Sequence, residues 1–208
     1  IAIGTAKLFG FELMSNFKFP YFSRNIGEFW RRWHISLSTW FRDYLYIPLG
    51  GSNGSKWLSI RNIFIIFIIS GFWHGAEWKF IIWGLIHAFL YIPLFLMRKN
   101  RSYNKSIVAK NSWLPSLSEL LHMGITYFII LIAWVFFRSE NVNHAIIYLQ
   151  HMIENFGLPE TNRGGLYFTG ILVFADWIIK MGPKKFRYHL DLEVLNESTP
   201  ETWKRKLL

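Results

Sequence analysis

The sequence predicts an all-α protein, a polytopic bundle of transmembrane helices. Of its 208 residues, 52% are hydrophobic and 19% aromatic, while only 17% are charged, which is too apolar for an ordinary soluble domain. Several apolar runs approach the roughly 20 residues that a helix needs to cross a bilayer. The formal net charge of +10 comes from bases that flank these runs instead of following one helix face. We therefore expect a lipid bilayer around the chain and no nucleic acid as a partner.

Apolar runs predict four to five membrane segments in chain order. Three are clear, namely Ser59–Trp73, Lys79–Met97 and Leu117–Phe137. Leu166–Met181 is shorter, and Ile1–Leu13 has the composition of the tail of a longer helix. The chain opens without a methionine and ends on the basic stretch WKRKLL, so we expect a fragment of a longer membrane protein.

Basic residues orient these segments. The connection after Met97 contains five bases and no acid, so it should be cytoplasmic; the bases are Arg98, Lys99, Arg101, Lys105 and Lys110. The connection Ser139–Gly165 has one base against three acids, as an external loop would. Lys79–Met97 should then run from outside to inside. Residues 24–61 should accordingly form an interfacial or re-entrant region on the cytoplasmic side.

Residues 142–156, VNHAIIYLQHMIENF, form a segment of a different kind. Apolar residues recur at helical spacing, as at Ile146, Leu149 and Ile153, with polar residues between them. This pattern predicts an amphipathic helix on the external surface of the membrane.

Residues 29–57 combine aromatic and basic side chains: FWRRWHISLSTWFRDYLYIPLGGSNGSKW. At helical spacing, one stripe consists of Trp30, His34, Ser38 and Phe41, and another of Trp33, Leu37, Trp40 and Tyr44. Arg31, Arg32 and Arg42 fan out beside them, and the glycine-rich residues 48–55 should end the helix. On composition alone, the favoured interpretation is an interfacial helix, with tryptophans at headgroup level and arginines on phosphates.

The stretch SGFWHGAEW, Ser70–Trp78, places two ionisable residues at membrane depth. Such residues are expensive and mark either a function or a buried partner. His74 lies between Gly71 and Gly75, which would let a backbone or a substrate approach closely. Burial favours a neutral imidazole that can accept a proton, so His74 is either a catalytic base or a member of a polar network.

For the other histidines the sequence predicts no catalytic role. His87, in an apolar run, is expected to be a core histidine with satisfied hydrogen bonds, and loop or surface positions are expected for His122, His144, His151 and His189. The seven histidines show no spacing typical of a metal site, so we expect no metal.

Three stretches resemble the membrane-bound O-acyltransferase family, and in particular its bacterial branch that O-acetylates alginate. They are FWRRWHISLSTWFRDYLYIPLGG, ISGFWHGAEWKFIIWGLIHA and WVFFRSENVNHAIIYLQHM. The resemblance implies that residues 1–208 are part of one membrane domain whose N-terminal half and last helix are missing. It also implies a helical bundle crossed by a tunnel, in the bacterial cytoplasmic (inner) membrane.

The resemblance assigns roles to particular residues. His74 matches the catalytic histidine of the family, and His34 matches the polar residue of its second motif, on the side of the acyl donor. The donor would be acetyl-CoA, with Arg31, Arg32, Arg42 and Ser38 as candidates to bind it. An acyltransferase of this branch would acetylate a cell-surface polysaccharide such as alginate, together with a periplasmic or extracellular SGNH-type acetyltransferase.

Other functions stay open at this stage. The resemblance extends to the enzymes that transfer D-alanine to teichoic acid, which share FW..WH and FRDY. An intramembrane histidine and glutamate also fit a transporter or proton relay. A subunit that only anchors an enzyme would need neither histidine. The oxyanion hole is unassigned, the amides near Gly71 and Gly75 being candidates.

Overall fold

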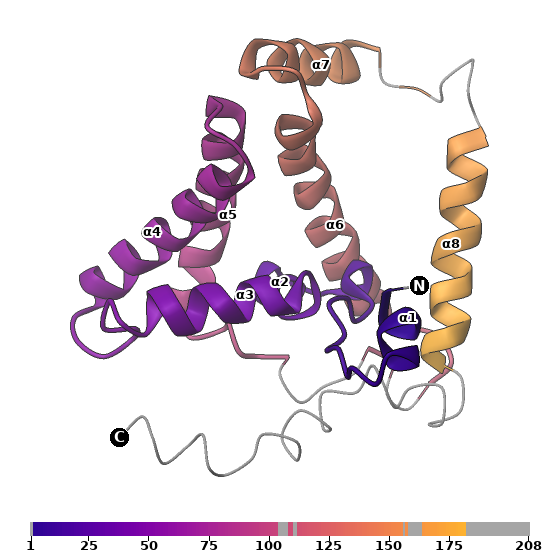
Figure 1. Cartoon of the computed structure of the whole chain (residues 1–208). Helices are drawn as coiled ribbons and strands as arrows, with labels where there is room; N and C mark the ends of the chain where they lie inside the picture. Colours follow the sequence, from indigo (N-terminus) through magenta and orange to yellow (C-terminus); the bar gives the residue numbers. More distant parts are fainter. Residues whose placement is uncertain (1, 104–107, 110–111, 156, 158–163, 182–208) are drawn as a thin grey trace. The chain divides into compact units, whose positions relative to one another are not determined.

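A computed structural model describes residues 2–103, 108–109, 112–155, 157 and 164–181. These residues form helices, turns and loops with no β-strand, which confirms the predicted all-α class (Figure 1). The chain divides into two units, Ile1–Phe19 with Pro159–Leu208, and Pro20–Leu158. The first unit contains α1 (Ala2–Leu8) and α8 (Gly164–Met181); α8 carries the fourth predicted segment.

Three helices of the second unit are long and apolar enough to cross a membrane: α4 (Lys56–His74), α5 (Trp78–Leu96) and α6 (Leu117–Arg138). They confirm the three clear segments of the sequence. Their ends are set locally, because Ser55 caps α4 and Ser116 forms a capping box with Glu119 at the start of α6. Glu77 is the N-cap residue of α5, although its side chain makes no capping hydrogen bond.

The backbones of α4 and α5 approach closely at two glycines. A side chain at Gly71 would collide with the Phe80 carbonyl of α5, and one at Gly84 would collide with the Phe67 carbonyl of α4. Small residues at helix crossings allow this contact. The close approach predicted at Gly71 is therefore made by α5, which leaves no space there for a substrate.

The aromatic and basic motif folds as three pieces instead of the single helix that its spacing predicts. They are α2 (Ile26–Arg32), α3 (Ile35–Phe41) and η2, a π-helical turn (Arg42–Tyr46). The chain turns at His34, whose backbone is left-handed, with φ 45° and ψ 55°. Few non-glycine residues adopt this conformation, and histidine is one of those enriched in it.

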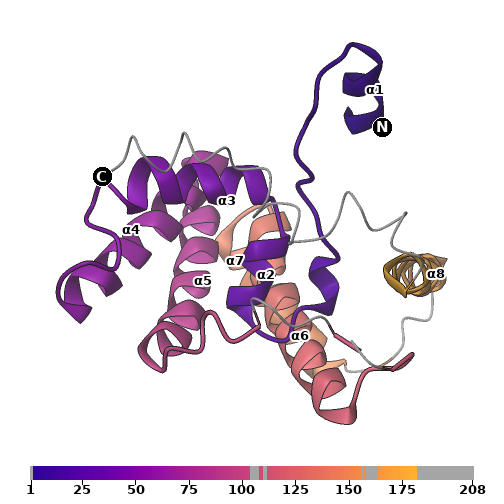
Figure 2. The ribbon, with the colours of Figure 1, turned by 90° about the horizontal axis from the view of Figure 1, so that it is seen from below.

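Figure 2 shows α2 between α5 and α6. Its buried Phe29 and Ile26 form a hydrophobic cluster with Ile130 of α6, and Leu90 and Leu94 of α5 pack against the cluster. The exposed fraction of Phe29 is 1%, and its burial in this cluster packs α2 against α5 and α6.

A buried ion-pair cluster holds the start of α2. The Glu28 carboxylate accepts hydrogen bonds from the guanidinium groups of Arg24, at 3.0 Å, and Arg32, at 2.6 Å. Arg24 also pairs with Glu119 of α6 at 3.0 Å. The exposed fraction of Glu28 is 1%, so its charge depends on these partners.

Contacts at the helix ends agree with the alternating direction that the basic residues predict. Arg31 Nη1 donates to the Asn100 carbonyl at 2.6 Å, so α2 lies beside the start of the basic connection. Lys79 Nζ donates to the Ser139 carbonyl at 2.9 Å, so the start of α5 lies beside the end of α6. Which of these ends faces the cytoplasm stays a prediction.

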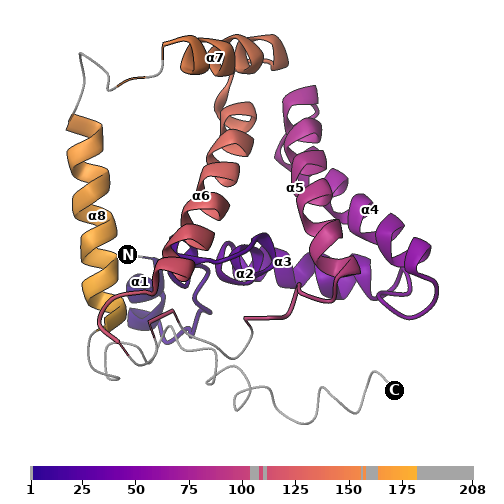
Figure 3. The same ribbon diagram turned by 180° about the vertical axis from the view of Figure 1, so that it is seen from behind.

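The predicted amphipathic segment forms α7 (Val142–Glu154), and Phe156 of the predicted range lies outside the described residues. Asn141 caps it by accepting a hydrogen bond from the His144 amide at 2.9 Å. Figures 1 and 3 show α7 across the end of α6. Only Ala145 of this helix is buried.

Candidate functional site

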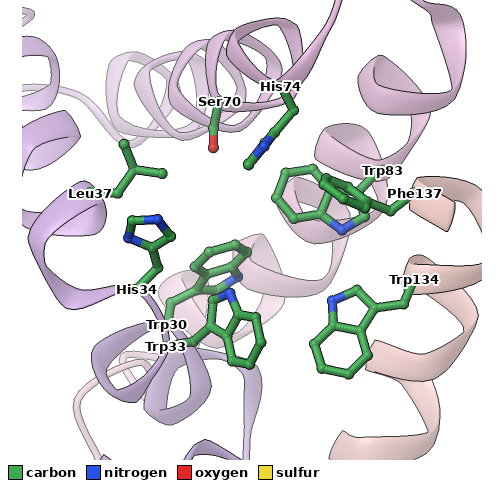
Figure 4. Close-up of a pocket in the computed structure, with 9 residues that line it drawn as sticks. All are labelled: Trp30, Trp33, His34, Leu37, Ser70, His74, Trp83, Trp134 and Phe137. Atoms are coloured by element: carbon green, nitrogen blue, oxygen red, sulfur yellow. The ribbon is translucent and has the colours of Figure 1, made fainter. Parts of the chain in front are cut away.

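A cavity of about 130 Å³ lies among α2, α3, α4, α5 and α6 (Figure 4). Aromatic side chains make up most of its wall, and the polar side chains in it are few. The lining residues are Trp30, Trp33, His34, Leu37, Ser70, His74, Trp83, Trp134 and Phe137. The two histidines predicted from sequence, 40 positions apart in the chain, therefore face one cavity.

His74 enters this cavity from the last turn of α4. Its imidazole is half-buried and lies perpendicular to three rings, with centroid distances of 5.4 Å to Trp83, 5.0 Å to Phe137 and 4.9 Å to Trp73. Glu77 is exposed and pairs with Lys79 at 3.4 Å. Among the described residues, no carboxylate pairs with His74, so the glutamate of the motif is not its partner.

His34 enters from the wall opposite α4, beside Leu37 (Figure 4). The turn at His34 explains how the site is assembled. In one continuous helix, Trp30 and His34 would belong to one stripe and Trp33 and Leu37 to another. The left-handed residue rotates α3 relative to α2, and all four side chains line the same cavity.

Ser70 is a site residue that the sequence analysis did not single out. It lies one helical turn before His74 on α4, and its hydroxyl points into the cavity (Figure 4). The i, i+4 spacing within SGFWH is the signal that could have found it. Trp83, Trp134 and Phe137 were also missed, because nothing local distinguishes them from other aromatic residues of membrane helices.

The four candidates for donor binding lie outside the cavity lining. Arg32 is held in the Glu28 cluster; burial lowers the pKa of its guanidinium, and the Glu28 charge opposes this effect. Arg31 is bound to the Asn100 carbonyl, and the Ser38 hydroxyl donates to the Trp33 carbonyl at 3.4 Å. Arg42 differs, since its side chain is 59% exposed and pairs only on the surface, with Asp43.

The glycines flanking His74 do not present free amides. Gly71 lies within α4, and the Gly75 amide donates to the Phe72 carbonyl at 3.1 Å. The Ser70 hydroxyl is therefore the neutral donor closest in sequence to His74 on the cavity wall.

The remaining histidines lie away from the cavity lining. His87 is fully buried, which confirms its predicted core position, but neither of its ring nitrogens has a hydrogen-bond partner among the described residues, so the expectation of satisfied hydrogen bonds was wrong. His122, His144 and His151 are exposed. His189 lies outside the described residues. No group of three or more potential metal ligands occurs within the described part of the chain.

Several known proteins are similar to this chain. It is 42% identical over 83% of its length to the probable alginate O-acetylase AlgI of Pseudomonas syringae pv. tomato. It is 41% identical over 74% to the peptidoglycan O-acetyltransferase of Helicobacter pylori, and 34% identical over 69% to the teichoic acid D-alanyltransferase of Bacillus subtilis. The chain spans only 31%, 27% and 37% of these three relatives.

A family model also matches residues 1–134, which include both histidine motifs and most of the cavity wall. Its description is MBOAT, membrane-bound O-acyltransferase family. The match covers well over half of the chain, and it agrees with the three apolar helices and with the relatives. The chain belongs to the membrane-bound O-acyltransferase family.

Proposed function

We propose that the complete protein transfers an acetyl group from cytoplasmic acetyl-CoA to a hydroxyl of an extracytoplasmic acceptor, for the O-acetylation of a bacterial cell-surface polysaccharide such as alginate. The observation that carries this proposal is the shared cavity of His34 and His74. Two polar side chains from distant motifs line one largely aromatic pocket, which places them where a bound thioester and an acceptor hydroxyl can react.

His74 is the general base in this proposal. Its neutral imidazole takes the proton of the acceptor hydroxyl while the hydroxyl oxygen attacks the thioester carbonyl carbon. The new C–O bond forms, the C–S bond breaks, and the coenzyme A thiolate leaves. The imidazolium returns its proton to the thiolate or to solvent, so His74 is regenerated and the step balances.

Ser70 and His34 have supporting roles. The Ser70 hydroxyl, one turn from His74, can donate a hydrogen bond to the carbonyl oxygen as negative charge develops there. His34 enters from the opposite wall, and α2 beside it contacts the basic connection predicted to be cytoplasmic. This position supports a role in receiving the donor.

Relatives support acetyl over D-alanyl as the transferred group. Six relatives whose names specify acetylation are 38% to 42% identical to this chain, and two teichoic acid D-alanyltransferases are 34% and 32% identical. D-alanyl transfer to teichoic acid is the second candidate, because alignments with those proteins cover 69% and 66% of this chain. An SGNH-type acetyltransferase on the outer face of the inner membrane would complete the transfer to the polymer.

The test uses the full-length protein, purified with its SGNH-type partner in lipid vesicles. Labelled acetyl-CoA and a D-alanyl carrier-protein thioester are supplied in parallel, with a polysaccharide acceptor. We expect consumption of acetyl-CoA and label in the acceptor, both abolished by His74→Ala. Consumption of the D-alanyl thioester alone would favour the second candidate. No thioester turnover, with solute or proton uptake instead, would replace both with a transporter.

A further inference from the structure

His87 lies directly behind the wall of the cavity. Its exposed fraction is 0%, and its imidazole lies nearly perpendicular to two indoles that line the cavity. The centroid distances are 4.9 Å to Trp30, at 82°, and 4.8 Å to Trp83, at 75°. Phe67 of α4 stacks on the ring at 6.1 Å. His87 is thus enclosed by aromatic side chains.

The nitrogen atoms of this cluster are not hydrogen-bonded. Both ring nitrogens of His87 and the indole Nε1 atoms of Trp30 and Trp83 are buried, and within the described residues none of them has a hydrogen-bond partner. A neutral imidazole has one donor and one acceptor, and each indole has one donor. The perpendicular rings allow edge N–H groups to meet ring faces, an interaction weaker than an ordinary hydrogen bond.

Packing alone does not explain a histidine at this position. A buried polar atom without a partner destabilises the folded protein, whereas leucine or phenylalanine would fill the space without that cost. In the interior of a membrane protein, a polar side chain is retained chiefly where it has a function. Departures from the most stable choice are expected at functional sites.

Trp83 connects His87 to the proposed general base. The ring centroid of Trp83 lies 4.8 Å from that of His87 and 5.4 Å from that of His74, and the Trp83 and His74 rings are at 85°. Trp83 also borders the cavity itself. The orientation of the Trp83 indole therefore determines the shape of the cavity beside the His74 imidazole.

We propose that His87 is a positioning residue of the acyl-transfer site. Its polar ring edge holds the Trp83 and Trp30 indoles perpendicular to itself, and this orientation shapes the wall against which His74 and the acyl group lie. His87 acts through Trp83 and does not touch the reacting atoms. The inference rests on the proposed function, since its effect is on turnover.

The test compares His87→Leu with His87→Asn in the full-length protein with its partner. Leucine and asparagine have nearly the same shape, but only asparagine has polar atoms that can orient an indole. We expect the leucine variant to unfold at a temperature no lower than the wild type while its kcat falls about tenfold or more with donor KM unchanged. The asparagine variant should retain clearly more turnover. Phe89→Leu, at an exposed position on α5, is the control and should behave as the wild type.

Equal turnover in the two His87 variants would overturn the proposal, as would higher turnover in the leucine variant. A leucine variant that fails to accumulate would also overturn it, because the imidazole would then be needed for folding. His87→Met and His87→Gln repeat the comparison with a longer pair of side chains. An inactive wild type would instead reject the proposed function, which keeps the two failures distinguishable.

Discussion

Two regions of this molecule, both of which include residues of α2, differ in the environment of their polar side chains. In the Glu28 cluster, one carboxylate accepts from Arg24 and Arg32, and Arg24 reaches on to Glu119. In the cavity, His34, Ser70 and His74 lie among aromatic rings and aliphatic surface. In the Glu28 cluster, each buried charge has a partner of opposite charge, so these side chains have a structural role. Polar groups that face an aromatic cavity are available for chemistry.

The largest effect that this comparison predicts is the loss of activity in His74→Ala. Removing a general base lowers turnover by roughly a hundredfold to ten-thousandfold. The temperature of unfolding should stay near that of the wild type, because no described side chain forms an ion pair with His74. Polymer acetylation and thermal unfolding of the full-length protein are the two measurements.

His122→Ala is the matched control for this variant. His122 is exposed on α6, where its ring nitrogen pairs with the Ser118 carbonyl at 2.7 Å. It should retain full activity. Near wild-type acetylation in His74→Ala would show that His74 is not the general base. The cavity would then not differ from the Glu28 cluster in having a catalytic role.

Glu28→Gln should produce the opposite phenotype. It removes the buried carboxylate charge that Arg24 and Arg32 share, while Arg24 keeps its ion pair with Glu119, and breaking a buried ion pair costs about 3–5 kcal/mol of stability. Abundance in the membrane and the temperature of unfolding should both fall. Glu140→Gln makes the same chemical change at an exposed position and should have no effect. A stable but inactive Glu28→Gln protein would mean that the cluster takes part in catalysis.

His34→Ala tests whether the two ends of the cavity have different roles. We expect activity to fall about a hundredfold through loss of donor positioning. The donor KM should change more than in His74→Ala, because His34 lies on the opposite wall from the proposed base. Kinetics at varied acetyl-CoA concentration measure the difference, and unchanged donor parameters would count against this role.

Ser70→Ala should lower kcat by less than His74→Ala does. Loss of one hydrogen-bond donor to a developing oxyanion corresponds to about a hundredfold fall in kcat. Thr is the informative replacement, since Ser70→Thr keeps the hydroxyl and should recover part of the activity. Equal loss in the alanine and threonine variants would point to altered helix packing at this buried position.

The smallest effect is expected from Arg42→Gln. This arginine is exposed and pairs with Asp43 on the surface, so the change should alter stability by less than about 1 kcal/mol. If Arg42 binds the phosphates of the donor, the donor KM rises and becomes less sensitive to salt. An unchanged KM at low salt would leave donor binding to residues outside these motifs.

Apolar composition and the spacing of basic residues determined the class of this protein and its main helices. A run of apolar residues must hydrogen-bond its backbone internally when it crosses lipid, so α4, α5 and α6 follow from local sequence. The resemblance of the motifs singled out His34 and His74. The same local reasoning was wrong for the aromatic motif, where it predicts one helix.

Only the tertiary structure decided how the site is assembled. The left-handed turn at His34, the contact of α5 with Gly71 and the aromatic wall from α6 depend on partners distant in the chain. Periodicity reports which residues share a face of one helix, but it does not report where a helix bends or which helix packs beside it. His87 shows the same limit, since its burial was expected from sequence, whereas its position between Trp30 and Trp83, one ring away from His74, required the fold.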